Sequence, residues 1–396
     1  MPAHGCLTNL RHLGGFLAIA GRGTISAAAE SVAASQPALT QALAGLEARL
    51  GVPLFDRRHD GMVLTEPGRI LRVRVERCTD HLRRAMSEIG ARPHLAGQLS
   101  MSRIRALIAV AEEGSLRMAA RACDLRVSSI SRSCRDLELR LGVTLLERTS
   151  TGLGPTRRAE QLARLSRLAL AELREAEDEL RIWRGEYTGR LAIGCLPLAQ
   201  STILPAALAR FTVEYPRIDC SIVDGYYATL SRALGHADID LIIGALRRGD
   251  LSEEFEEHAL FGDELVVVAR KGHALEGRHR LTLADLHGFS WIAPRTSAPA
   301  REYFERLLGE LPQAPAAAIE TGAHSVMRGL LRATDRLTLV SLSQVRDDLT
   351  HGLLCQLDLN LPPSARIIGY THRRQWLPNL PQQRFLEILR SVVHDL

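Results

Sequence analysis

The chain has 396 residues, 46% of them hydrophobic, and a formal net charge of +5. This length allows two or three domains with ordinary hydrophobic cores. No run of about 18 apolar residues occurs, so we expect no membrane span. The N-terminus lacks the basic and apolar segments of a secretory signal, which predicts a cytoplasmic protein. Seven scattered cysteines without a Cys-x-x-Cys pair, and histidines without ligand spacing, predict neither disulfides nor a metal site.

The positive charge is concentrated in the first half of the chain. Residues 1–98 carry a net charge of +4 and residues 99–188 a net charge of +3, whereas the remainder carries −2. An excess of arginine in one half of a chain is typical of contact with an anionic polymer.

A segment of about 57 residues occurs twice, with an offset of 91 residues. The run LEARLGVPLFDRRHDG at 46–61 returns as LELRLGVTLLERTSTG at 137–152. Two copies so far apart are too few for a solenoid. The repeat therefore indicates a duplicated domain.

The first copy has the pattern of a winged helix-turn-helix. Apolar spacing predicts a helix that ends at Gly23, a short alanine-rich helix, and a third helix that ends at Gly51. Ser35 is a candidate N-cap of the third helix, and Pro37 lies in its first turn. Two apolar runs around Gly61 predict a hairpin. The alternative from pattern alone is a three-helix bundle with an incidental polar face.

In a winged helix-turn-helix the third helix enters the major groove by its N-terminal end. Glutamine can pair with adenine there, hydroxyls can bind bases or phosphates, and arginines in the hairpin suit phosphate or the minor groove. The candidate DNA-binding residues of the first copy are Ser35, Gln36, Pro37, Thr40, Gln41, Arg57 and Arg58.

The second copy keeps the scaffold but changes the end that would read DNA. Val127 replaces Gln36, and Arg132 replaces Gln41. Three interpretations stay open: this copy reads other bases, binds DNA without selectivity, or is a degenerate copy kept as a spacer or dimer surface. Its candidate DNA-binding residues are Arg126, Ser128, Ser129, Ser131, Arg132, Arg135 and Arg148.

The run ESVAASQPALTQALAGLEARLGVPLFDRRHDGMVLTEPG closely resembles the DNA-binding domain of the LysR-type transcriptional regulators. The shared elements are an alanine-rich second helix, Ser-Gln-Pro-Ala-Leu, Leu-Glu, Leu-Gly-Val-Pro-Leu-Phe and Leu-Thr. The resemblance implies a sequence-specific DNA-binding regulator whose winged domain is duplicated.

Two helical linkers follow the winged copies. Residues 67–98 resemble a shortened form of the family's long dimerisation helix. Residues 158–188 carry leucines on one side, and the resemblance implies that this helix pairs with its twin from another subunit; a solitary solvated helix is the alternative. The candidate apolar residues are Leu162, Leu165, Leu168, Leu173 and Leu180. A dimer would carry four winged units.

From residue 189 onwards, strands and helices alternate, which predicts an α/β domain with mostly parallel sheets. This half resembles the family's effector domain, a two-lobed relative of type 2 periplasmic binding proteins. The predicted architecture is thus multidomain: α-rich winged helix-turn-helix domains at 8–66 and 99–157, helical linkers at 67–98 and 158–188, and an effector-binding domain at 189–396.

Ligands of such domains bind at strand C-termini and helix N-termini, where free N–H groups suit anions. We therefore expect a small organic anion as effector, while sugars and aromatic compounds stay open. Each residue at these helix starts could instead be only a helix cap. The candidate effector-binding residues are Gln200, Ser201, Thr202, Tyr226, Thr229, Thr296, Ser297, His324 and Ser325.

The sequence predicts binding rather than catalysis, because it contains no phosphate loop, HExxH or GxSxG motif. We expect no cofactor. The expected partners are double-stranded DNA, a small effector and further copies of the chain in a dimer or tetramer, with RNA polymerase as a candidate. The alternatives are an architectural DNA-binding protein and an α/β ligand-converting enzyme.

Overall fold

The structure is a computed structural model that describes residues 6–59, 61–150, 152–201, 203–247, 252–296, 298–309, 319–361, 364 and 366–394. The chain divides into two compact units, Met1–Gly189 and Arg190–Leu396. Among the described residues, no helix combines the length and the apolar character that crossing a bilayer requires.

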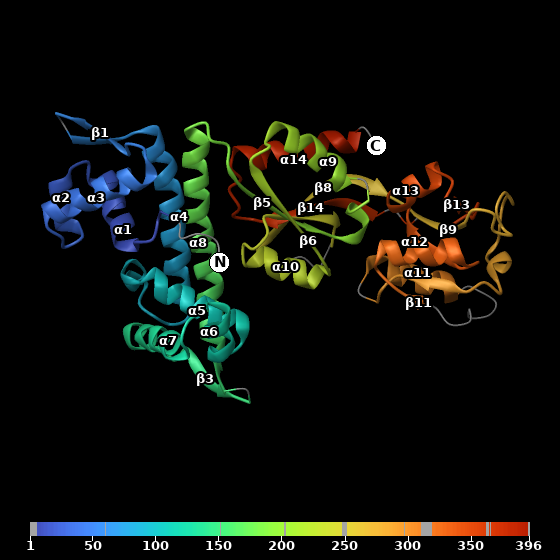
Figure 1. The fold of residues 1–396 in the computed structure, drawn as a ribbon, viewed down its shortest axis with the longest axis horizontal. Coiled ribbons are helices and arrows are strands. Elements are labelled where there is room, and N and C mark those ends of the chain that lie inside the picture. The colour runs from blue at the N-terminus through green and yellow to red at the C-terminus, as the bar shows by residue number, and fades with distance from the viewer. Residues whose placement is uncertain are drawn as a thin grey trace. The chain divides into compact units, whose positions relative to one another are not determined.

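The first winged unit, shown in blue in Figure 1, has the predicted order of helices and hairpin. Ser35 caps the third helix by accepting a hydrogen bond from the Ala38 N–H. Gly23 and Gly51 end their helices at φ of 72° and 68°, in the left-handed region that favours glycine. The elements are α1 (Leu10–Arg22), α2 (Ile25–Ser31), α3 (Gln36–Leu50), β1 (Phe55–Arg58) and β2 (Gly61–Leu64).

The second winged unit repeats this order. Its elements are α5 (Met101–Glu113), α6 (Leu116–Ala122), α7 (Val127–Leu141), β3 (Leu146–Thr149) and β4 (Gly152–Pro155). The repeated Leu-Glu pair has a physical reason in both units. The carboxylate of Glu47 accepts a hydrogen bond of 2.7 Å from the Leu54 N–H, and that of Glu138 accepts one of 2.7 Å from the Leu145 N–H. Each glutamate thus ties its third helix to its wing.

Two long helices, α4 (Glu66–Glu88) and α8 (Arg157–Trp183), lie side by side in the first unit (Figure 1). Three side-chain contacts show that they run antiparallel: Arg74 to Glu179 at 2.6 Å, His81 to Glu172 at 3.8 Å, and Arg164 to Glu88 at 3.9 Å. A short 3-10 helix, η1 (Pro93–Gln98), follows α4.

The antiparallel pair has an approximate two-fold axis. Glu172 is the repeat equivalent of His81, 91 residues further along, and the two face each other near the middle of the helices. The winged units also pack equivalently, α1 against α4 and α5 against α8. Residues 6–189 therefore have the arrangement of a dimer of winged units within one chain.

This pairing determines what covers the apolar side of α8. The sequence led us to expect a twin helix from another subunit, but in the structure α4 of the same chain packs there. The α8 residues buried in the shared core include Leu162, Leu165, Leu173 and Leu180, while Leu168 is partly buried. From α4, the core receives Leu71, Val75, Cys78, Leu82, Ala85 and Met86.

The C-terminal unit contains two five-stranded sheets, one in each lobe. The first has the order β6 (Ile218–Asp224), β5 (Gly189–Cys195), β7 (Leu241–Ala245), β14 (Arg366–Arg373) and β8 (Phe255–Asp263). The second has the order β11 (Ile319–Glu320), β10 (Trp291–Ala293), β12 (Leu337–Ser341), β9 (Leu265–Arg270) and β13 (Leu354–Gln356).

Helices accompany both sheets. The first lobe has α9 (Ile203–Glu214), α10 (Tyr227–Gly235), α14 (Leu380–His394) and the short η2 (Pro197–Ala199). The second lobe has α11 (Pro299–Gly309), α12 (His324–Ala333), α13 (Leu342–Thr350) and the short η3 (Leu283–Leu286). The apolar faces of α9 and α14 share one core with β5, β7 and β14.

Both sheets are mixed, whereas the alternation of strands and helices predicted mostly parallel sheets. β5 pairs parallel with β7, and β10 pairs parallel with β11 and β12. β14 is antiparallel to β7 and β8, and β9 is antiparallel to β12 and β13. The antiparallel strands adjoin the two passages of the chain between lobes, from β8 to β9 and from β13 to β14.

Candidate DNA interface and effector pocket

The N-terminal end of α3 presents a polar surface. Ser35, Gln36, Pro37 and Gln41 are exposed, and Thr40 is half-buried with its hydroxyl donating to the Gln36 carbonyl at 2.9 Å. The side-chain amide groups of Gln36 and Gln41 make no hydrogen bond within the described part of the chain. The opposite side of α3 is fixed in the core by Leu39, Leu43, Leu46 and Leu50. Packing thus points the polar side outwards.

The wing of the first unit adds positive charge near this helix in the fold. Arg57 and Arg58 lie on β1, opposite Met62 and Gly61 of β2, and both are exposed. Neither guanidinium pairs with a carboxylate of the described residues. An exposed arginine without an internal partner is suited to binding phosphate.

The tip of α7 in the second winged unit carries more arginines and more apolar side chains than the tip of α3 in the first winged unit. Arg126, Ser128, Ser129, Arg132 and Arg135 are exposed at the start of α7, Ser131 is half-buried, and Arg148 is exposed on β3. The sequence analysis missed two residues here, Leu125 and Val127, which are 54% and 46% exposed. Apolar side chains at such a tip can contact the methyl group of thymine. The presence of Val127 at the position equivalent to Gln36 could have indicated an apolar contact at this tip.

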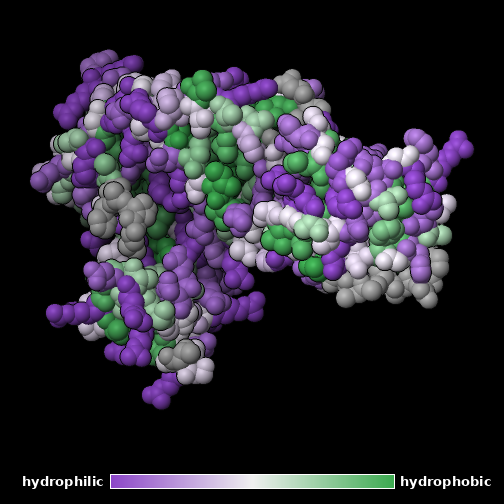
Figure 2. Space-filling view, turned by 45° about the vertical axis from the view of Figure 1, so that its right-hand side comes forward, coloured by the Kyte–Doolittle hydropathy of each residue, from purple (hydrophilic) through white to green (hydrophobic). Residues whose placement is uncertain are grey.

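The space-filling view agrees with this description of the winged units. At the lower left of Figure 2, hydrophilic side chains project from the second winged unit, and more hydrophobic side chains lie between them.

In the C-terminal unit, a cleft of about 750 Å³ is lined by residues of both lobes. It brings together five of the predicted effector-binding residues: Gln200, Ser201, Tyr226, His324 and Ser325. Thr229 and Thr296 do not line it. Thr229 is exposed on α10, and Thr296 is exposed and donates its hydroxyl to Glu320 at 3.2 Å. Thr202 and Ser297 lie outside the described residues.

The lining of the cleft includes two arginines that the sequence analysis missed, Arg247 and Arg295. The Arg247 guanidinium lies 4.7 Å from the centre of the Tyr227 ring, and that of Arg295 lies 4.5 Å from the centre of the Tyr226 ring. Arg295 follows β10 and Tyr226 follows β6, so this contact joins the lobes. Both arginines lie just after strands, and ligands of such domains bind at the C-terminal ends of strands, so this position could have identified them in the sequence.

Arg295 differs from other cations of the cleft because no described carboxylate pairs with it. In contrast, Arg328 contacts Asp348 at 3.2 Å, and Arg366 contacts Asp263 at 3.2 Å. The N-terminal turns of α10 and α12 also point to anion binding, since neither receives a side-chain cap.

His324 is held in the cleft wall as a neutral ring at neutral pH. Burial lowers the pKa of its imidazole, and the nearby Arg328 adds to this effect, while Asp348 opposes it. The ring contacts Asp348 at 3.6 Å and Gln344 at 3.3 Å. A neutral imidazole can donate or accept a hydrogen bond, so His324 adds polar recognition without a fixed charge.

The passages between the lobes meet at Asp263, the last residue of β8. Its buried carboxylate accepts hydrogen bonds of 2.5 Å from the hydroxyls of Ser341 and Ser343, and it contacts Arg366 at the start of β14. Asp263 therefore links the end of β12, the start of α13 and both connecting strands.

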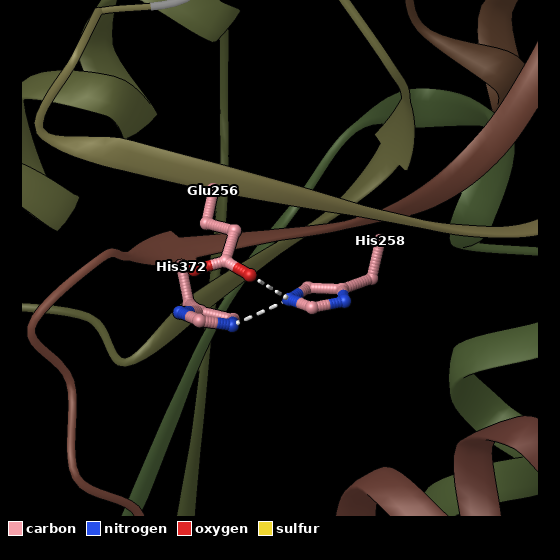
Figure 3. A group of neighbouring side chains, drawn as sticks. All are labelled: Glu256, His258 and His372. Carbon is pink, nitrogen blue, oxygen red and sulfur yellow. Dashed lines mark hydrogen bonds and ion pairs between the residues drawn. The ribbon is translucent and has the colours of Figure 1, made fainter.

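One group of side chains that the sequence analysis did not single out brings two histidines and a carboxylate together. Glu256, His258 and His372 converge on adjacent strands, with their ligand atoms within 4.8 Å of one another (Figure 3). Burial lowers the pKa of the His372 imidazole. The sequence could not show this group because 114 residues separate the two histidines.

Three buried thiols show no sign of activation. Burial raises the pKa of Cys78, Cys134 and Cys195 to about 12, with a nearby carboxylate adding to the effect in each case. Reactive cysteines have depressed rather than elevated pKa values. These three thiols are therefore packing groups.

Comparison with known proteins agrees with the fold. Residues 10–69 and 101–160 each match the bacterial regulatory helix-turn-helix protein, lysR family, and residues 184–393 match the LysR substrate binding domain. The chain is 33% identical over 398 residues to the HTH-type transcriptional regulator GalR of Pseudomonas putida, covering 98% of each chain.

Solved structures show the same fold. A full-length OxyR variant from Pseudomonas aeruginosa matches with a TM-score of 0.54 and 18% identity over 75% of this chain and 95% of that chain. CbnR in complex with its target DNA matches with a TM-score of 0.51 and 20% identity over 74% and 100%. Each leaves about a quarter of the present chain uncovered, which is close to the offset of 91 residues between the two copies of the repeat.

Two winged helix-turn-helix units followed by a two-lobed domain define a DNA-binding transcription regulator with an effector-binding domain. The chain belongs to the LysR family of transcriptional regulators.

Proposed function

We propose that one chain presents two recognition helices, α3 and α7, to a single DNA duplex. The observation that carries this proposal is the antiparallel pairing of α4 with α8 around the contact of His81 with Glu172. A two-fold arrangement of winged units matches the two-fold symmetry of duplex DNA with paired half-sites. In this chain the two units differ, so the two half-sites need not be identical.

The charges between the helices favour this pairing within the chain. Glu172 contacts Arg74 at 2.9 Å and Arg77 at 2.7 Å, and all three are buried or half-buried. Two α8 helices from different chains in the same register would place Glu172 against Glu172 at the axis. Two buried carboxylates repel each other, so the α4–α8 pair is preferred.

The candidate residues take different roles in this arrangement. Gln36 and Gln41 would read base edges, whereas Arg57, Arg58 and Arg148 on the wings would bind phosphates. Arg132 and Arg135 would bind guanine or phosphate in the second half-site, and Val127 would contact a thymine methyl group.

We further propose that the effector is a small organic anion bound in the cleft by Arg295 and the N-terminal turns of α10 and α12. An anion on Arg295 competes with the contact between Arg295 and Tyr226, so it changes how the lobes meet. The protein thereby acts by binding alone, without catalysis or a cofactor. Its setting is the cytoplasm, with RNA polymerase as a partner.

Any assembly of several chains into a dimer or tetramer would use a surface other than the apolar sides of α4 and α8, which already cover each other. Such an assembly would carry several pairs of winged units and would gain affinity from multivalent contact with DNA.

The experiment for the DNA-binding proposal is selection of bound duplexes from a random pool with the full chain. Native mass spectrometry then counts the chains on a selected duplex trimmed to its protected length. We expect two unlike half-sites occupied by one chain. If every protected duplex of this length requires two chains, with one half-site each, the proposal is wrong.

The effector proposal is tested by thermal shift with a panel of small mono- and dicarboxylates. We expect some of them to raise the melting temperature of the wild type and of Arg332→Gln, an exposed control at the end of α12. Arg295→Gln should lose that response. An equal response in Arg295→Gln would exclude Arg295 as the anion ligand.

A further inference from the structure

Three side chains meet on one face of the first-lobe sheet. Glu256 and His258 lie two residues apart on the edge strand β8, so both point to the same face. His372 lies on the neighbouring strand β14, directly opposite Glu256 in the antiparallel register. Figure 3 shows the three side chains directed towards one another.

The polar atoms of this group are close enough to share one ion. Nε2 of His258 lies 2.9 Å from Nε2 of His372 and 3.4 Å from a carboxylate oxygen of Glu256. In a tetrahedral zinc site with Zn–N bonds of about 2.0–2.1 Å, two nitrogen ligands lie roughly 3.3 Å apart. A change of a few tenths of an ångström therefore converts the observed arrangement into a coordination sphere.

The surroundings orient both imidazoles for coordination. Nδ1 of His372 lies 2.8 Å from the Arg373 carbonyl oxygen, which can only accept a hydrogen bond. Nδ1 therefore carries the proton, and Nε2 of the neutral ring presents its lone pair. This second hydrogen bond is typical of metal-bound histidine. The His258 ring stacks on Tyr370, with centroids 4.9 Å apart, which holds the other imidazole in place.

We propose that Glu256, His258 and His372 bind one Zn²⁺ ion through two Nε2 atoms and one carboxylate oxygen, with solvent as the fourth ligand. Two histidines and one glutamate form one of the known ligand sets of zinc. The side chains of His258 and Glu256 are 36% and 43% exposed, so an ion can enter from solvent.

A bound ion would cross-link the edge strand β8 to β14. These two strands adjoin the two passages of the chain between the lobes. The ligands lie near the beginning of β8, and the Asp263 junction lies at its end. Zinc would thus fasten the strand pair at the end away from the junction and stabilise the folded domain by mass action.

The test uses the full chain after removal of metal with a chelator. Zn²⁺ is titrated calorimetrically, and Co²⁺ serves as a spectroscopic substitute. We expect one equivalent of Zn²⁺ to bind and to raise the melting temperature. His258→Ala and His372→Ala should each weaken binding by more than about tenfold, and Glu256→Gln should weaken it less. The Co²⁺ spectrum should show ligand-field bands without a thiolate charge-transfer band.

The matched control is His279→Ala, because His279 also lies beside a carboxylate, Asp358 at 3.3 Å. This variant should keep full Zn²⁺ binding. The melting temperature of each metal-free variant shows that it is folded, so the loss of the zinc-induced rise reports on binding. Absence of Zn²⁺ binding by the wild type, unchanged affinity in both histidine variants, or a thiolate band with Co²⁺ would each overturn the proposal. In these cases the 2.9 Å contact is only a hydrogen bond between two imidazoles.

Discussion

Gln36 and its repeat equivalent Val127 begin the two recognition helices, and they present different chemistry to a groove. The amide of Gln36 is exposed and can bind adenine bidentately. We expect Gln36→Ala to reduce the discrimination between a selected site and random DNA by ~1–3 kcal/mol, measured as a ratio of dissociation constants at constant salt concentration.

The control for Gln36→Ala is Gln98→Ala, an exposed glutamine in η1 outside the candidate interface. It should leave discrimination unchanged. Equal discrimination by Gln36→Ala and the wild type would remove Gln36 from the residues that read bases. The substitution should not reduce the stability of α3, because alanine is a better helix former than glutamine.

Glu172 makes the stability of the N-terminal compact unit, Met1–Gly189, dependent on pH. Burial raises the pKa of its carboxyl group, but the neighbouring His81, 3.8 Å away, the hydrogen bond from Arg77, and the charges of Arg77 and Arg74 outweigh this effect and lower the pKa to about 2. Its stabilising contribution is therefore complete above about pH 4.5 and is lost as the pH falls towards about 2. It amounts to roughly 3 kcal/mol of unfolding free energy.

This dependence can be measured by calorimetry of the wild type and Glu172→Gln at about pH 7 and about pH 3. The variant should be less stable than the wild type at the higher pH, and the difference between them should shrink at the lower pH. The difference between the two proteins cancels the titration of the C-terminal unit. A difference that does not change with pH would show that Glu172 is not ionised in the folded state.

At the residue scale, the sequence predicts best where the chemistry is local. The cap Ser35 and the helix ends Gly23 and Gly51 follow from short-range patterns, and the structure contains them. The cleft residues Arg295 and Tyr226 are 69 positions apart in the chain, and no pattern brings them together. Which distant side chains meet depends on tertiary packing, which a single sequence does not display.

At the scale of elements, the apolar side of α8 was predictable, but its partner was not. Periodicity shows that a face is buried, and it does not show which surface buries it. The strand β8 is hard to recognise from sequence for a related reason. It is an edge strand with the polar sequence FEEHALFGD, so it lacks the apolar run of a central strand.

The pairing of α4 with α8 includes a part-buried bidentate contact between Arg74 and Glu179. Nε and Nη2 of Arg74 donate to the two carboxylate oxygens of Glu179 at 3.1 and 2.6 Å. We expect a coupling free energy of about 1–3 kcal/mol in a double-mutant cycle of Arg74→Met and Glu179→Gln, measured by thermal unfolding. Loss of the pairing should also weaken binding of a duplex that carries both half-sites.

A second cycle on the same helix provides the comparison. Arg69 and Glu66 form an ion pair of 2.6 Å in which both side chains are 57% exposed. Their coupling should be below about 0.5 kcal/mol, because solvent screens exposed pairs. If the two cycles gave equal coupling, the Arg74–Glu179 contact would not hold the helices together.

At the scale of the whole molecule, the duplication places two paired winged units in a single chain. Intramolecular pairing removes the dependence of the DNA-binding unit on protein concentration, because the second winged unit is always present beside the first. Because both winged units belong to one chain, their sequences can also differ, as Val127, Arg132 and Arg135 differ from their equivalents in the first copy.

The salt dependence of the affinity for DNA can show whether both winged units bind DNA. Arg132→Ala with Arg135→Ala should weaken binding and lower the slope of log affinity against log salt concentration by about 1 for each phosphate contact removed. Arg140→Ala, at the other end of α7, is the matched control and should leave the slope unchanged. A smaller affinity with an unchanged slope would mean that the two arginines bind bases rather than phosphates. If both quantities equal those of the wild type, the second unit serves only to pair α8 with α4, and a single recognition helix in each chain contacts DNA.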